Sequence, residues 1–120
     1  MGVGIVGGSV SPSTALTLNA QTGTTYTFVL TDANNTLVTA SNASAQTYTI
    51  PPNSSVAYPI GAQLNIIQIG AGQVSFAQGS GVTIASNGAT STAPKLRVQY
   101  SSSSAIKVNT DSWYVIGDIS

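Results

Sequence analysis

Short stretches of alternating apolar and polar residues recur along the chain from Thr25 onward. In the first of them Tyr26, Phe28 and Leu30 alternate with threonine and valine, which is the period of a strand with one buried face. Further stretches follow at intervals of about ten residues, a spacing typical of all-β domains. They are residues 37–40, 47–50, 63–69, 74–77, 82–85, 96–101, 105–108 and 113–117. No stretch has the periodicity of a helix.

Clusters of turn-forming residues separate these stretches. They are Asp32-Ala33-Asn34-Asn35, Pro51-Pro52-Asn53, Gly70-Ala71-Gly72, Ser86-Asn87-Gly88, Ser101 to Ser104 and Asn109-Thr110-Asp111. Glycine, proline, asparagine and aspartate favour turns through their backbone conformations and local hydrogen bonds. The pattern predicts an all-β fold, a single compact antiparallel β-sandwich or barrel-like domain of about nine short strands.

The first part of the chain has a different texture. Residues 1–24 are mostly glycine, serine, threonine and alanine with scattered aliphatic residues, which predicts an extended arm before a β-domain of residues 25–120. The aliphatic residues of the arm are candidate anchors for attachment to another protein: Ile5, Val6, Val10, Leu16 and Leu18. The run at the N-terminus lacks the basic region of a signal peptide and is too short to span a bilayer.

Two segments leave their arrangement open. In residues 63–69 the apolar phase shifts between Ile66 and Ile67, so this strand is either buried on both faces or contains a bulge. A central strand at a subunit contact satisfies both descriptions. In residues 74–84 two apolar pairs lie eight residues apart around two glycines, which fits either a hairpin or two coils of a β-helix.

Charged side chains are scarce. The chain has three basic and three acidic residues, no histidine and a formal net charge of zero, whereas about 25% of residues are charged in an average domain. No electropositive field exists to attract nucleic acid or an anionic membrane. Because 42% of residues are hydrophobic and charge repulsion is nearly absent, the chain is either assembled with copies of itself or part of a larger assembly. We expect an oligomer.

The same composition argues against catalysis, cofactors and metals. A serine nucleophile needs a base, and without histidine only Lys95 or Lys107 remains. The aspartates Asp32, Asp111 and Asp118 are far apart and lie beside turn residues, where aspartate normally bonds its own backbone. Gly2, Gly4 and Gly7 match a dinucleotide-binding pattern without its flanking strand and helix. We expect no enzyme activity, no cofactor and no metal site.

Aromatic and threonine residues supply the remaining candidates. Trp113 and Tyr114 are adjacent on a predicted strand, so they point to opposite faces and only one enters a given core. We assign Tyr58, Ile67, Trp113 and Tyr114 to a subunit interface or to stacking on a glycan. Threonine pairs at 25 and 27 and at 47 and 49 suggest a threonine ladder, but two copies do not define a repeat.

Three segments carry a family resemblance. "YTFVLTDANNTLV", "IPPNSSVAYPIGAQLNIIQIGAGQVSFAQGSGVTI" and "LRVQYSSSSAIKVNTDSWYVIGDI" together resemble a β-rich module of tailed-bacteriophage virion proteins, which recurs in tail fibres, minor tail proteins and head-decoration proteins. The resemblance covers about residues 25–120. Its marks are Pro51-Pro52-Asn53, Pro59-Ile60-Gly61, Gly70-Ala71-Gly72-Gln73 and the segment from Trp113 to Asp118.

The resemblance implies a virion surface component that forms a homotrimer. A module of this kind that follows only a short arm suits a head-decoration or cement protein. Such a protein would attach through that arm to the major capsid protein or another virion protein. The alternative is a tail-fibre or receptor-binding module on the tail, in which exposed aromatic residues contact host glycans. Both are structural or binding roles on the virion surface, and neither involves nucleic acid or a membrane.

Overall fold

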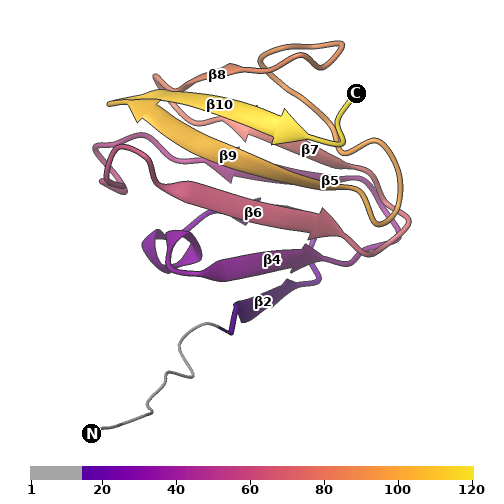
Figure 1. The fold of residues 1–120 in the computed structure, drawn as a ribbon. Coiled ribbons are helices and arrows are strands. Elements are labelled where there is room, and N and C mark those ends of the chain that lie inside the picture. Colours follow the sequence, from indigo (N-terminus) through magenta and orange to yellow (C-terminus); the bar gives the residue numbers. More distant parts are fainter. Residues whose placement is uncertain (1–14) are drawn as a thin grey trace, which may run out of the picture.

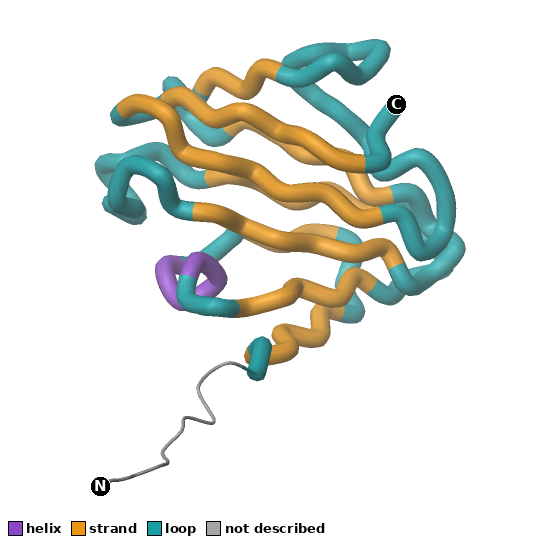
Figure 2. The backbone as a smooth tube through the Cα atoms, viewed as in Figure 1, coloured by secondary structure: helices purple, strands orange, loops and turns teal. Residues whose placement is uncertain are grey.

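A computed structural model describes residues 15–120, and strands dominate this part of the chain (Figures 1 and 2). The predicted all-β character is therefore confirmed. The strands are β2 (Thr17–Gln21), β3 (Thr25–Thr27), β4 (Thr36–Ala40), β5 (Gln46–Ile50), β6 (Gln63–Gln68), β7 (Val74–Gln78), β8 (Thr83–Ala85), β9 (Ser102–Asn109) and β10 (Ser112–Gly117). One turn of 3-10 helix, η3 (Leu30–Ala33), precedes β4.

The strands form two sheets, and the chain passes from one to the other. The six-stranded sheet has the order β2-β4-β6-β9-β10-β8, and the three-stranded sheet has the order β3-β5-β7. In Figure 1 the six-stranded sheet lies in front and β5 and β7 lie behind it. Because each crossing returns the chain to its first sheet in the same direction, β2, β4 and β6 are parallel, as are β3, β5 and β7.

The predicted antiparallel arrangement is therefore wrong for much of the fold. Antiparallel pairing occurs between β6 and β9 and between β9 and β10, whereas β8 is parallel to β10. Alternating patterns do not distinguish the two directions, since both bury every second side chain. The two apolar pairs of residues 74–84 belong to β7 and to the segment entering β8, which lie in different sheets. They form successive crossings and not a hairpin.

We call one passage of the chain through a strand of each sheet a coil. Successive coils place similar side chains next to one another in a sheet. In the three-stranded sheet Tyr26 is the partner of Tyr48, and Tyr48 is the partner of Phe76. The rings of Tyr26 and Tyr48 are 5.4 Å apart, and Phe28 lies 5.8 Å from Tyr48 and 6.3 Å from Phe76. Aromatic rings at these distances bury large apolar areas and favour edge or offset contacts. This cluster forms one half of the core.

The other half of the core lies under β9 and β10. Trp113 is 2% exposed, and its ring meets the ring of Tyr58 edge-on at 5.3 Å. The Tyr58 hydroxyl donates to the Val29 carbonyl oxygen at 2.8 Å. Aliphatic residues of both sheets fill the space between the two aromatic groups. The two sheets thus share a single core.

Part of the predicted arm belongs to the sheet. Strand β2 pairs with β4 over its whole length, from Thr17 opposite Thr36 to Gln21 opposite Ala40. The sparse apolar residues of this segment predict an arm. An edge strand, however, can form through its backbone hydrogen bonds to one neighbouring strand and needs few apolar side chains. The predicted strand at 96–101 is also absent, because only isolated bridges at Lys95 and Leu96 occur there.

Buried tyrosines make stability sensitive to alkaline pH. Burial raises the pKa of Tyr48 to about 12, and burial followed by the nearby Asp32 carboxylate raises the pKa of Tyr26 and of Tyr58. A tyrosine in the unfolded chain ionises near pH 10, so the folded state is stabilised fully below this pH and progressively less above it. We expect a constant melting temperature from pH 6 to 9 and a fall above about pH 10.

Circular dichroism melts across this range provide the measurement. Each pH unit between the unfolded and folded pKa of Tyr48 removes about 1.4 kcal/mol. Tyr48→Phe removes a hydroxyl that has no hydrogen-bond partner among the described residues and should make the alkaline fall shallower. A melting temperature that stays constant up to pH 11.5 would contradict this account.

Candidate interaction surface

The outward side of the six-stranded sheet is a broad face that faces away from the core. Paired strands present the same face at paired positions, so the inward Val38, Ile66 and Trp113 define which residues point outward. The apolar outward residues are Leu18, Ala20, Leu37, Ile67, Ile106, Val108, Tyr114, Ile116 and Ala85. The polar outward residues are Thr39, Gln63, Asn65, Ser102, Ser104 and Thr83. We call this set the outer face.

No member of the outer face is charged, because the charged residues lie elsewhere. Asp32 and Lys107 are buried, Asp111 lies in the β9–β10 turn, and Lys95 lies in the segment before β9. Arg97 and Asp118 form an exposed ion pair with Nε and Oδ1 2.8 Å apart. The guanidinium lowers the pKa of Asp118, with help from the Ser101 hydroxyl, and the carboxylate raises the pKa of Arg97.

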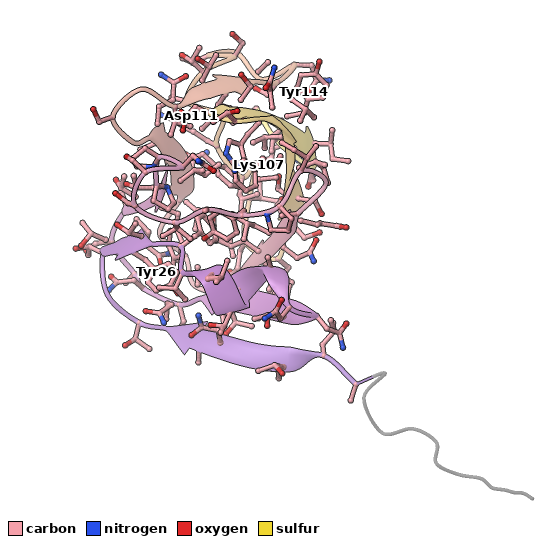
Figure 3. All side chains as sticks on the ribbon, turned by 90° about the vertical axis from the view of Figure 1, so that its left-hand side faces the viewer. Tyr26, Lys107, Asp111 and Tyr114 are labelled. Carbon is pink, nitrogen blue, oxygen red and sulfur yellow. The ribbon has the colours of Figure 1, made fainter. Side chains whose placement is uncertain are left out.

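Several apolar side chains of the outer face are well exposed. Leu18 is 66% exposed, Ile116 57% and Tyr114 55%. Figure 3 shows Tyr114 at the surface, whereas Lys107 lies inside the fold. Single exposed apolar residues are common on proteins, whereas several of them together on one face are typical of interaction sites. Such a face is suited to contact with another protein surface.

A groove adjoins this face at the β8–β10 edge. Its volume is about 320 Å³. The lining residues are Thr83, Ala85, Val108, Asn109, Ser112, Trp113 and Tyr114. The Tyr114 ring beside amide and hydroxyl groups is the combination that neutral sugars require, because they stack on aromatic rings and hydrogen-bond with uncharged polar groups.

A second groove of about 490 Å³ lies at the opposite edge, between β2 and η3. Asp32 is one of its lining residues and is 2% exposed. Its carboxylate accepts hydrogen bonds from Asn19 Nδ2 at 2.8 Å, from the Tyr26 hydroxyl at 2.7 Å and from the Val29 backbone N–H at 2.9 Å. These three donors occupy the carboxylate, so its role is to join η3 to β2 and β3.

The described residues contain no cluster of three or more metal-binding side chains of the histidine, cysteine, aspartate or glutamate type. The three aspartates lie apart in this part of the fold, as they do in the sequence. Asp111 accepts a hydrogen bond from the Asn53 backbone N–H at 2.7 Å, and Asp118 is bound to Arg97. Each therefore has a structural partner.

The structure separates the residues that we assigned to an interface or to glycan stacking. Tyr58 and Trp113 are core residues that are 3% and 2% exposed, so neither ring is accessible to a partner. Tyr114 is exposed on the outer face, as the alternation of Trp113 and Tyr114 requires. Ile67 also lies on that face and is half-buried. Strand β6, which contains Ile66 and Ile67, pairs in continuous register with β4 and β9 and therefore contains no bulge.

The predicted attachment residues have two different outcomes. Leu16 and Leu18 are exposed at the edge of the six-stranded sheet, whereas Ile5, Val6 and Val10 lie outside the described residues. The sequence reasoning missed Ile106 and Ile116, which lie on the outer face beside Tyr114. Their alternation with inward residues was visible, but it did not show which face is covered.

No protein-family model, no curated protein and no solved structure matches this chain. Within residues 15–120 there is no helix with the length and apolar character needed to cross a bilayer.

Proposed function

We propose that this chain is a non-enzymatic structural protein of a bacteriophage particle. Three copies associate and decorate the exterior of the capsid. The observation that carries the proposal is the outer face of the six-stranded sheet, which is broad, partly apolar and uncharged. The bacteriophage context is supported by the resemblance of residues 25–120 to virion modules.

The composition of the outer face suits contact between proteins. The centres of protein interfaces are depleted in charged residues and enriched in aromatic ones. Tyr114 and Ile116 supply exposed apolar area, and Asn65 and Ser104 supply hydrogen-bonding groups. Burying this face between copies removes apolar area from water, which is worth about 25 cal/mol for each Å². The homotrimer is the state implied by the family resemblance.

Attachment to the particle is assigned to the N-terminal part of the chain. Leu16 and Leu18 are exposed at the β2 edge, and an edge strand offers unpaired backbone groups to a partner. This edge and the aliphatic residues before it are the proposed contacts with the major capsid protein or another virion protein. The proposed location is the capsid exterior, with the tail as the alternative.

Placing a charge on the outer face should weaken association strongly. Ile116 is 57% exposed, so Ile116→Lys should fold normally, but a buried lysine without a partner is strongly unfavourable in an interface. We expect the dissociation constant of the trimer to rise at least tenfold, as measured by sedimentation velocity over a range of concentrations. Thr90→Lys, at an exposed position in the loop after β8 and not a member of the outer face, is the matched control and should leave association unchanged. Equal behaviour of the two variants would exclude the outer face as the contact surface.

A second candidate function is supported by the groove beside Tyr114. In this alternative the chain is a tail-fibre or receptor-binding module, and the Tyr114 ring stacks on a neutral sugar of the host surface. Retention on an immobilised neutral oligosaccharide would favour this candidate. Binding to capsids that lack the protein would favour the decoration role instead.

A further inference from the structure

Lys107 is buried, although lysine is rarely found in protein interiors. It is 2% exposed on the inward side of β9, and Trp113 is its neighbour on β10. The ion pair found among the described residues joins Arg97 to Asp118 and does not involve Lys107. Burial of an amine in such a place is costly, and it requires close polar contacts.

The amine donates hydrogen bonds to two neutral oxygen atoms. Lys107 Nζ donates to Asn53 Oδ1 at 2.7 Å and to the Tyr58 carbonyl oxygen at 2.7 Å. The backbone of Asn53 is itself fixed, because its N–H donates to Asp111 Oδ1 at 2.7 Å. Figure 3 shows Lys107 inside the fold and Asp111 on the neighbouring turn. The amine is thus in contact with the carboxamide of Asn53, whose backbone is positioned by its hydrogen bond to Asp111.

We propose that Lys107 and Asn53 form an intramolecular isopeptide bond. A new bond forms between Lys107 Nζ and Asn53 Cγ, and the bond between Cγ and Nδ2 of the asparagine breaks. Starting from the ammonium form, one proton passes from Lys107 Nζ to Asn53 Nδ2, which gives Nζ the lone pair that attacks Cγ. A second proton of Nζ then follows to the departing nitrogen, which leaves as an ammonium ion. Atoms and charge balance without an oxidant, a reductant or a further reactant.

The surroundings favour this reaction. A nucleophile and an electrophile held in contact react far faster than the same groups in solution, because the cost of bringing them together is already met. The Tyr58 and Trp113 rings pack edge to face beside Lys107 and limit the access of water. Asn53 lies in the loop after β5, and Lys107 lies on β9. The bond would therefore join two distant parts of the fold.

Such a bond would give the chain a covalent brace that cysteine cannot supply. The sequence contains no cysteine, and the ion pair described here is exposed. A link between residues 53 and 107 closes a long loop and restricts the unfolded chain, as a disulfide does. The consequence would be a higher melting temperature and resistance to proteolysis.

Denaturing mass spectrometry of the purified full chain tests the proposal. We expect the intact mass to be lower by one ammonia than the sequence predicts. Trypsin should fail to cleave after Lys107 in the denatured protein, and tandem spectra should identify a branched peptide that contains Asn53. A wild-type protein at the full mass, cleaved after Lys107, would overturn the proposal.

Four variants separate this bond from other losses of ammonia. Lys107→Arg and Asn53→Ala should restore the full mass, while Lys95→Arg, at an exposed lysine, should retain the loss. Asn53→Asp should lose one water, because a carboxyl group can form the same bond. If Lys107→Arg still loses ammonia, the loss arises elsewhere, for example at Asn87-Gly88, and the proposed bond does not exist.

Discussion

Gly72→Ala should be among the most damaging single-methyl changes in this protein. A Cβ at Gly72 would lie 1.8 Å from the Ser44 carbonyl oxygen and 2.7 Å from the Asn42 carbonyl oxygen. Both contacts are with the backbone of the preceding coil, which is held by the Gly72 N–H donating to Asn42 O. The two turns must separate to admit the methyl group, and we expect unfolding to become easier by about 3 kcal/mol or more.

Chemical denaturation of Gly72→Ala and Gly23→Ala measures this effect with a matched control. Gly23 also lies in a turn between coils, but a Cβ there meets its nearest atom, the Thr25 carbonyl oxygen, at 3.7 Å. This is an ordinary contact, so Gly23→Ala should change stability by less than about 1 kcal/mol. Similar stabilities for the two variants would mean that the turns of successive coils are not in contact.

Asp32→Ala should have an effect of similar size for a different reason. The substitution removes an acceptor that satisfies the Asn19 amide, the Tyr26 hydroxyl and the Val29 backbone N–H. A buried donor left without a partner costs about 1–3 kcal/mol. These three donors are partly buried, and Asn19 Nδ2 keeps its bond to the Tyr26 hydroxyl oxygen, so we expect a total loss of about 3 kcal/mol in the free energy of unfolding. A role limited to a turn, as expected from the sequence, would cost far less.

Two further variants define the origin of this loss. Asp32→Asn retains one acceptor oxygen and should cost about half as much as Asp32→Ala. Asp118→Asn changes an exposed carboxylate in an ion pair, and surface pairs contribute little, so its effect should be small. If all three variants unfold at the same denaturant concentration, the Asp32 contacts do not stabilise the fold.

The sequence predicted most strand positions but not their arrangement. Strands β4 to β8 and β10 coincide closely with alternating stretches, because alternation reports which residues are buried. It does not report strand direction. The coils also differ in length, since 19 residues separate Thr17 from its partner Thr36 and 28 separate Leu37 from its partner Asn65. Unequal coils conceal a periodic signal.

The sequence contains one true signal of the repeat. The triplet Thr-Tyr-Thr occurs at residues 25–27 and again at 47–49, but two copies alone do not define a repeat. The structure pairs these triplets residue for residue as β3 and β5. Strand β7 follows with Ser75, Phe76 and Ala77, which retains the central aromatic residue but replaces both threonines. The third member of the repeat was therefore hidden.

The candidate site was only partly predictable for a similar reason. Alternation required that Trp113 and Tyr114 point to opposite faces, but only the assembled fold shows that tryptophan enters the core. Tyr58 and Asn53 lie in a loop without periodicity, and their contacts with Lys107 and Trp113 join residues about fifty positions apart. No local pattern reports such contacts.

Sedimentation equilibrium of the purified chain at micromolar concentration tests the central claim most directly, because the proposed decoration role depends on association through an uncharged face. The account predicts a single species with three times the chain mass of 12.1 kDa, and the same mass at low and high salt, since few ion pairs are available for screening. A homogeneous monomer of 12.1 kDa under both conditions would contradict it.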